Sequence, residues 1–446
     1  MANEKAKPTL QEKLEKRKFR LPGKAVTFLY NLIGSTVLLP KYEPHITKNA
    51  DITKRDGPCF LIWNHLSRLD HLYTMKAAYP ARYNMVAGYS EFFRAHLHTV
   101  FRLNQILPKK VFTNDRLGIK AINAIIKQGG IVTFSPEGMS SIYGVNQPVV
   151  PGSGHFLKHY KIPVYYLKLR GQYLTSTKHY LEERKGRTEA ELSLLFTPEQ
   201  LSEMTAEEIE NKLNETFRHD DYEWGQKNHI KWEMHGRSAE HLDEICYRCP
   251  RCGEDLVMRA EGSKIRCSKC GNGAVVNDYY EFEPFDDKCV LPVSPSKWVE
   301  QERAAVIDEI RADPGFSFTE DMVLGYLPPY KYVPKSVTSV DCGQGRITFD
   351  HKGIHYKGTR HGQEWSFDLG YSVVYSLIIM TSTAQFSLYV NGQFYEFKPA
   401  RRSVGKMLLI KEEMHRYHYN TWKNLPWYDY MYEGKALGID NPNNKG

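Results

Sequence analysis

Three short apolar runs, separated by segments of helical periodicity, constrain the fold of this chain more than any other feature. The runs are Cys59–Trp63, Ile131–Phe134 and Pro163–Leu167, and each has the length and composition of a buried strand. Between the first two, residues 117–127 carry apolar side chains at helical spacing and are followed by a Gly-Gly helix stop. Strands and helices alternating at this spacing predict βαβ units, and therefore an α/β domain with a mixed, largely parallel sheet.

A polar segment follows the first run directly and places a histidine and an aspartate five residues apart. It reads N-H-L-S-R-L-D from Asn64, so the pair is His65 and Asp70. At a strand-to-helix junction the loop can expose the imidazole while the helix brings the carboxylate beneath it. A neutral imidazole accepts a proton near pH 7, and an adjacent carboxylate fixes its tautomer. The pair predicts general-base chemistry on a hydroxyl group; the alternative is a histidine that caps a helix in a polar loop.

Four segments, in order along the chain, carry a resemblance to the glycerolipid acyltransferases, the family of lysophosphatidate and glycerol-3-phosphate acyltransferases. They are N-H-x-S-x-x-D at 64–70, V-F-T-N-D-R at 111–116, F-S-P-E-G at 134–138 and I-P-V-Y-Y-L at 162–167. The resemblance covers residues 25–220. It implies the family's αβ fold and transfer of a fatty acyl group from acyl-CoA or an acyl-carrier-protein thioester to the hydroxyl of a lysophosphatidate-like acceptor.

The resemblance also implies roles for individual residues. His65 is then the general base and Asp70 its orienting partner, while Arg116, Glu137 and Gly138 bind the glycerol and phosphate of the acceptor. An arginine fork suits a phosphate for geometric reasons. The carboxylate at 137 has a second interpretation, in which it caps the turn after its strand.

The third segment departs from the family pattern after Gly138. Met139-Ser140-Ser141 stands where the family usually has Thr-Arg-Ser, so one phosphate contact is missing. Either other basic residues such as Lys109 and Lys110 hold the acceptor, or the acceptor lacks a phosphate. The departure also supports a rival hypothesis, a catalytically degenerate acyltransferase fold that binds lipid or nucleic acid. The intact histidine and aspartate argue against this rival, because binding alone needs no base.

Four of the eight cysteines form two C-x-x-C pairs, each followed by glycine. They are Cys249, Cys252, Cys267 and Cys270, in a pattern that resembles a zinc ribbon. Four thiolates suit tetrahedral Zn²⁺, and a closed Cys₄ site has no open position, so we expect a structural zinc. Cys246 is a weaker alternative ligand, because no glycine follows it. Without a secretory signal, this pattern indicates a reducing compartment and not disulfides.

The N-terminal segment is basic over its first 24 residues and apolar-rich over Ala25–Leu39. The apolar stretch is shorter than the ~20 residues that span a bilayer, and it has no signal-peptide cleavage site. It predicts either a helix in the membrane interface or a core helix behind a solvated tail. The net charge of +8 favours anionic membrane surfaces and gives no clustered nucleic-acid footprint. We therefore expect a cytoplasmic protein, peripheral to the inner face of the membrane.

The last third of the chain is rich in short β runs separated by turns. These runs include Val373–Met380 and an Asn-Gly hairpin signal at 391–392, and they end in a helix over 403–417. They resemble a pleckstrin-homology (PH) or GRAM-type barrel; the alternative is a small domain that only packs on the enzyme. We predict these segments: 1–40, basic amphipathic N-terminus; 41–245, acyltransferase; 246–290, zinc ribbon; 291–335, linker with a helix; 336–420, PH/GRAM-like; 421–446, tail.

Overall fold

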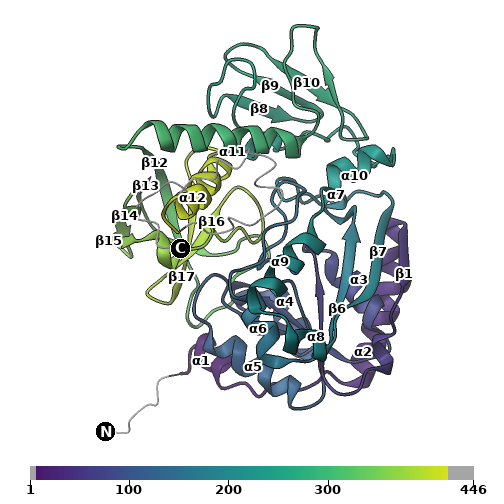
Figure 1. Ribbon diagram of the computed structural model, residues 1–446. Helices are drawn as coiled ribbons and strands as arrows, with labels where there is room; N and C mark the ends of the chain where they lie inside the picture. Colours follow the sequence, from purple (N-terminus) through teal and green to yellow (C-terminus); the bar gives the residue numbers. More distant parts are fainter. Residues whose placement is uncertain (1–6, 420–446) are drawn as a thin grey trace, which may run out of the picture.

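The largest unit of the computed structural model, which describes residues 7–419, is an α/β domain built on one seven-stranded sheet (Figure 1). The predicted tail at 421–446 lies outside the described residues. The strand order is β1-β7-β6-β2-β5-β3-β4. The strands are β1 (Pro44–Lys48), β2 (Cys59–Trp63), β3 (Tyr83–Gly88), β4 (Leu107–Lys109), β5 (Ile131–Phe134), β6 (Val164–Arg170) and β7 (Thr188–Phe196). Every neighbouring pair is parallel except β6 with β7, so the prediction of a largely parallel sheet is confirmed.

Helices cover both faces of this sheet, because the central strands are apolar on both sides. Alternate residues of β2 belong to two cores: Leu61 to the one that includes α3 (Asp70–Ala78), and Phe60 to the one that includes α5 (Arg116–Ile126) and α9 (Ala206–Phe217). The other helices before the ribbon are α1 (Leu10–Glu15), α2 (Lys24–Ile33), α4 (Ala95–Leu103), α6 (Ser153–Tyr160), α7 (Gln172–Thr175), α8 (Pro198–Glu203) and α10 (Asp221–Lys227). None of the helices described has both the length and the apolar composition needed to cross a bilayer.

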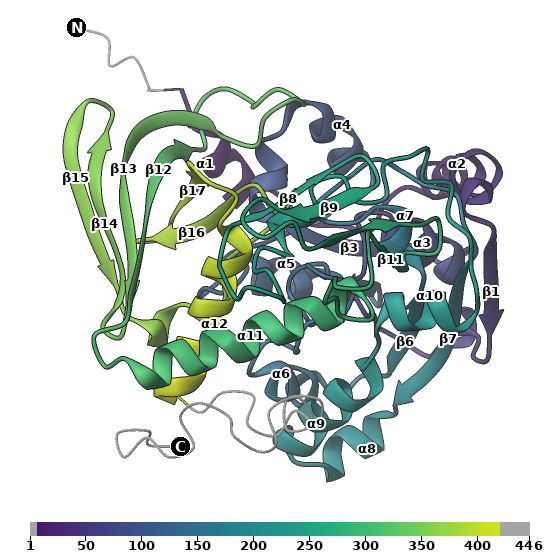
Figure 2. The same cartoon turned by 90° about the horizontal axis from the view of Figure 1, so that it is seen from above.

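The cysteine-rich segment forms a separate antiparallel sheet in the order β11-β10-β9-β8. Its strands are β8 (Met258–Glu261), β9 (Lys264–Cys267), β10 (Gly273–Val276) and β11 (Phe282–Pro284). The helix α11 (Pro295–Ala312) follows, and its Trp298 packs edge-on against Phe282 of the ribbon. The same helix packs across α12 (Val404–Tyr419), so it connects the ribbon to the C-terminal part of the chain (Figure 2).

Six antiparallel strands form the C-terminal sheet, in the order β15-β14-β13-β12-β17-β16. They are β12 (Ser317–Tyr326), β13 (Val340–Asp350), β14 (Gly353–Arg360), β15 (Gln363–Leu369), β16 (Phe386–Val390) and β17 (Gln393–Pro399). The edge strands β15 and β16 do not pair with each other within the described chain, so the sheet is an open half-barrel and not a closed barrel. The strand β12 lies inside the segment expected to be a linker.

The predicted strand Val373–Met380 is wrong. After the short 3₁₀ turn Tyr371–Val373 the chain runs as a loop, and Ile378 forms only one isolated bridge, with Ser387. Four apolar residues of this loop are buried, Val374, Leu377, Ile378 and Ile379, whereas Val373 is 59% exposed. Met380 lies against Gly88 of the α/β domain, where an added Cβ would be 2.3 Å from its Cε. Burial of loop residues therefore produced an apolar pattern that resembles a strand.

Candidate active site

A cavity of about 1540 Å³ opens at the carboxyl edge of the main sheet. Parallel strands bring their carboxyl ends to one edge, and loops after these ends usually form ligand sites in such sheets. Here Trp63 at the end of β2, Gly88 at the end of β3 and Phe134 at the end of β5 all line the cavity. His65, two residues beyond β2, lines it as well.

Hydrogen bonds from its neighbours fix the loop that carries His65. The side chain of Asn64 is fully buried and bridges to β6: its Nδ2 donates to the Leu169 carbonyl at 2.9 Å, and its Oδ1 accepts from the Leu169 N–H at 2.8 Å. The hydroxyl of Ser67 accepts from the Leu69 N–H at 3.1 Å and closes the turn that begins α3. Each polar residue of the segment therefore has a structural reason to be there.

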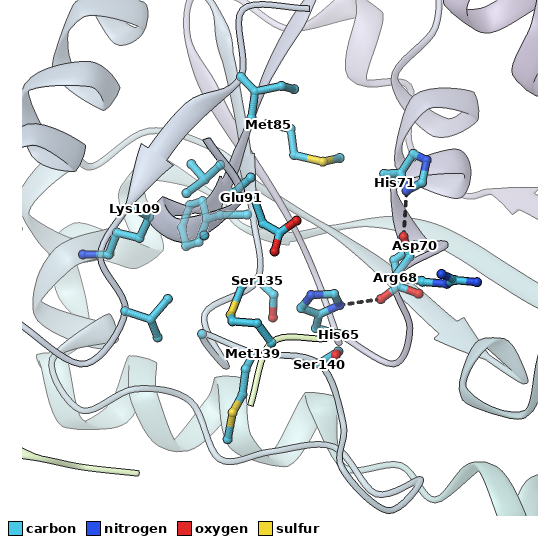
Figure 3. A pocket seen from close by; sticks show the side chains of 18 of the residues that line it. His65, Arg68, Asp70, His71, Met85, Glu91, Lys109, Ser135, Met139 and Ser140 are labelled. Carbon is cyan, nitrogen blue, oxygen red and sulfur yellow. Dashed lines mark hydrogen bonds and ion pairs between the residues drawn. The ribbon is translucent and has the colours of Figure 1, made fainter. Parts of the chain in front are cut away.

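The Asp70 carboxylate lies directly behind the imidazole of His65 (Figure 3). Its Oδ2 is 2.8 Å from His65 Nδ1 and also accepts from the Leu66 N–H at 2.8 Å. Burial raises the pKa of Asp70, and the hydrogen bonds from His65, Ser67 and Leu66 oppose that rise. Because Nδ1 faces the carboxylate, Nε2 is the ring nitrogen available to the cavity. His65 keeps about a quarter of its side chain exposed (26%), whereas Asp70 is buried.

Glu137 lies at the end of β5 but is not among the cavity-lining residues. One of its carboxylate oxygens accepts the backbone N–H of His65 at 2.8 Å, and the other accepts the backbone N–H of Gln147 at 2.6 Å. The side chain is 1% exposed, and burial raises its pKa well above the ordinary value for a glutamate. The contacts of this carboxylate therefore position the His65 loop.

The other two residues expected to bind substrate lie in different places. Gly138 lines the cavity with φ of +79°, and an added Cβ would be only 3.1 Å from Val111 and Val150, so the position suits glycine. Arg116 is exposed at the start of α5 and lines a smaller adjoining pocket with Lys109, which borders both cavities. The guanidinium therefore belongs to a basic mouth beside the main cavity.

The two lysines considered as substitutes for the missing arginine also lie in different places. Lys109 faces the cavity and lies 3.6 Å from Asp115. Lys110 instead lies over the rings of Tyr89 and Tyr389, and its Nζ donates to the Gly392 carbonyl at 3.2 Å. It joins the α/β domain to the C-terminal hairpin.

Sequence reasoning missed Lys178, a buried lysine in the cavity wall. Its Nζ donates to the Ser140 hydroxyl at 2.6 Å and to the Met380 carbonyl of the C-terminal domain at 2.7 Å. Burial lowers the pKa of Lys178 to about 7, against the opposing charges of Glu91 and Asp70. A partner 202 residues away is not visible in any local pattern.

Most of the wall that the α/β domain contributes is apolar. Tyr30 of α2, Met75 of α3, Met85 of β3, Phe101 of α4 and Ile122 of α5 all line it. A cavity of this size, with His65 beside an extensive apolar surface, suits a ligand that joins a hydrocarbon chain to a small reactive group.

The helix α2 presents apolar side chains to solvent as well as to the cavity. Phe28 and Leu29 are 55% and 54% exposed, and Leu32 and Ile33 are also exposed. The stretch at 25–39 is therefore not a core helix. It continues past Ile33 through a π-helical turn at Gly34–Leu38.

The four predicted cysteine ligands come together in the ribbon. All their Sγ atoms lie within 4.8 Å of one another, with Cys249 and Cys270 at 3.6 Å and Cys252 and Cys267 at 3.9 Å. Zn–S bonds of 2.3 Å in a tetrahedron require S–S separations of about 3.8 Å. The four thiols can therefore hold a metal ion such as zinc. Cys246 lies outside the group and contacts the Pro295 carbonyl instead.

No protein-family model matches the sequence, and no curated protein matches it. One solved structure to which the chain is similar is the 1-acyl-sn-glycerophosphate (LPA) acyltransferase PlsC from Thermotoga maritima. The identity is 15%, the match covers 44% of this chain and 77% of that chain, and the TM-score is 0.37. We assign no family on this basis.

Proposed function

We propose that this protein is an acyltransferase that moves a fatty acyl group from acyl-CoA or an acyl-carrier-protein thioester to the hydroxyl of a lysophosphatidate-like glycerolipid. The observation that carries the proposal is the His65–Asp70 pair, with its second ring nitrogen available to a large, mostly apolar cavity. An activated base beside a hydrocarbon-lined cavity serves a lipid-modifying reaction and has no purpose in a binding module.

His65 acts as the general base of the proposed reaction. Its Nε2 takes the proton of the acceptor hydroxyl while that oxygen forms a bond to the thioester carbonyl carbon. The C–S bond then breaks, and the imidazolium gives the proton to the departing thiolate, which leaves as a thiol. Asp70 keeps the Nδ1 proton in place and stabilises the positive charge on the ring.

We derive the substrate contacts from the main cavity and from the smaller pocket that adjoins it. Gly138 leaves room for the glycerol beside His65, because no side chain projects there. Arg116 and Lys109 form a basic pocket that suits a phosphate of one of the substrates. A zinc ion held by the four cysteines has a structural role, since the closed Cys₄ set leaves no position for a substrate.

We also propose that the protein works at the inner surface of the membrane. The cavity is lined by the inner faces of α2 and α4, while Phe28 and Leu29 of α2 and Leu103 of α4 are exposed. Apolar side chains beside a basic N-terminal segment suit an interface rich in anionic lipid.

The test is transfer of a radiolabelled acyl group from acyl-CoA or acyl-carrier protein to a panel of lysolipids and other alcohols. The proposal predicts a labelled diacyl product with at least one glycerolipid acceptor. No product with any donor and acceptor, together with a salt-sensitive shift on DNA or RNA, would instead support the degenerate binding module.

A further inference from the structure

The C-terminal domain forms part of the wall of the His65 cavity. Two of its segments line the cavity, Lys335–Thr338 between β12 and β13 and Ser372–Gln385 between β15 and β16. These are the segments in which the C-terminal sheet departs from regular strands.

Several contacts fix this wall against the α/β domain. The Val333 N–H donates to the Phe93 carbonyl at 2.7 Å, and the Ala95 N–H donates to the Val333 carbonyl at 2.9 Å. In the second segment, the Met380 carbonyl accepts from the buried Lys178, and the Met380 side chain fills the space beside Gly88. Each of the two segments is therefore held against the α/β domain by backbone or buried contacts.

The two walls differ in chemistry. Where the α/β wall is mostly apolar, the C-terminal segments contribute mainly hydroxyl, amide and ammonium groups. These are Lys335, Ser336, Thr338, Ser372, Tyr375, Thr381, Ser382 and Gln385. A ligand with a hydrocarbon part and a polar part would place the polar part against this second wall.

The charged side chains that line the cavity indicate which kind of polar group it can bind. Six lysine or arginine side chains line it, and four of these have carboxylate partners: Arg68 with Glu183, Arg94 with Glu91, Lys109 with Asp115 and Lys398 with Asp341. A fifth, Lys178, is buried and donates to Ser140 and Met380. Lys335 is exposed at the mouth and forms no ion pair with a carboxylate in residues 7–419. An anionic group entering here therefore meets the positive charge of Lys335, which no carboxylate compensates.

The geometry points to the C-terminal domain as the site for an anionic head group of the acceptor, with Lys335 as a contact that selects for it. This inference rests on the proposed function and makes it more specific: the acyl chains lie along the α/β wall, and the acceptor phosphate lies on the C-terminal wall. The pocket of Arg116 is then left to the phosphates of the thioester carrier.

The test is calorimetric titration of the full chain, without acyl donor, with a short-chain ether-linked alkylglycerol phosphate and with the same alkylglycerol lacking the phosphate. Lys335→Glu is expected to lower the affinity for the phosphate probe about tenfold and to leave the uncharged probe unchanged. Lys331→Glu is the matched control, because Lys331 is exposed in the same loop but does not line the cavity, and it should bind both probes like the wild type.

Three results would overturn the inference: Lys335→Glu binding the phosphate probe as tightly as the wild type, an equal loss for both probes, or a greater loss of phosphate-probe affinity in Arg116→Glu. Since no acyl donor is present, the titration reports head-group binding whether or not the protein turns over. Failure of the proposed function would appear only in the transfer assay.

Discussion

Glu137 is the residue for which the family resemblance and the geometry indicate different roles. The resemblance implies that its carboxylate binds the acceptor, whereas its two oxygens accept the backbone N–H groups of His65 and Gln147. These contacts are typical of a positioning residue, which acts on the reaction through the placement of His65.

Replacing Glu137 separates the two roles. Glu137→Gln puts an amide NH₂ opposite one of the N–H donors, so we expect a loss of about 1–3 kcal/mol in the free energy of unfolding. The kcat should fall roughly tenfold or more because the His65 loop shifts, while the KM for the acceptor stays within about twofold. Urea unfolding and steady-state kinetics measure both, with the exposed Glu364→Gln as control. A raised acceptor KM with unchanged stability would favour direct substrate binding.

The lowered pKa of Lys178 predicts a specific pH dependence of the folding stability. The ordinary pKa of a lysine is about 10.5, and burial lowers that of Lys178 to about 7. Between these pH values the unfolded chain holds a proton on this amine that the folded chain has released. Stability therefore rises with pH over this window, since the unfolded state binds more protons.

We expect Lys178→Met to remove this rise. Urea unfolding midpoints of wild type and variant, measured at several pH values between 7 and 10, give the slopes. The exposed Lys331→Met should keep the slope of the wild type. Identical slopes in wild type and Lys178→Met would show that this amine does not titrate in the window.

At the scale of elements, α2 has one face toward the cavity and another toward solvent. Its inner face lines the cavity through Thr27 and Tyr30. The π-helical turn that continues it packs tightly on α3 at Gly34, where an added Cβ would be 2.4 Å from Met75 Cε. Its outer face exposes Phe28 and Leu29. We expect Phe28→Asp with Leu29→Asp to reduce binding to anionic vesicles at least about tenfold without changing the unfolding midpoint.

Vesicle flotation and urea unfolding check this prediction. Val293→Asp is the matched control, because Val293 is also an exposed apolar residue (75%) but lies outside α2, between β11 and α11. Equal vesicle binding by wild type and the double variant would remove α2 as the membrane contact.

Local sequence signals predicted those elements whose environment is local. The strands β2 and β5 were recognisable because parallel strands covered on both faces are apolar throughout. The His65–Asp70 contact was predictable because the two residues lie on one turn at a strand-to-helix junction. The loop at 373–380 was mistaken for a strand because four of its apolar side chains are buried although the backbone forms no strand.

The parts of the site that the sequence did not predict depend on distant segments. The contact of Lys178 with Met380 and the C-terminal wall of the cavity join residues about 200 or more positions apart. The role of β12 was also missed, since its alternating pattern, interrupted by Gly325, lies in a stretch dominated by the helix α11.

At the scale of the whole molecule, the ribbon and α11 connect the two domains that enclose the cavity. Buried ion pairs join α11 to α12, with Arg303 at 2.8 Å from both Glu412 and Glu413. Loss of the ribbon fold should therefore disturb the His65 cavity, although the four cysteines lie outside that cavity.

We expect one zinc ion per chain, lost in the Cys252→Ser, Cys270→Ser double variant. Because binding of a structural zinc contributes directly to folding, the Tm should fall by several degrees and acyl transfer should fall with it. Metal analysis, thermal unfolding and the transfer assay measure this, with Cys289→Ser as the control outside the cluster. Full zinc content in the double variant would contradict the Cys₄ site.

The most direct test of the account is the kcat of His65→Ala for acyl transfer. Removing the general base should lower kcat by about 10²–10⁴-fold, while the unfolding midpoint and vesicle binding stay those of the wild type. Turnover at the wild-type rate in a folded His65→Ala protein would contradict the account, because the imidazole that lines the cavity would then have no part in the reaction.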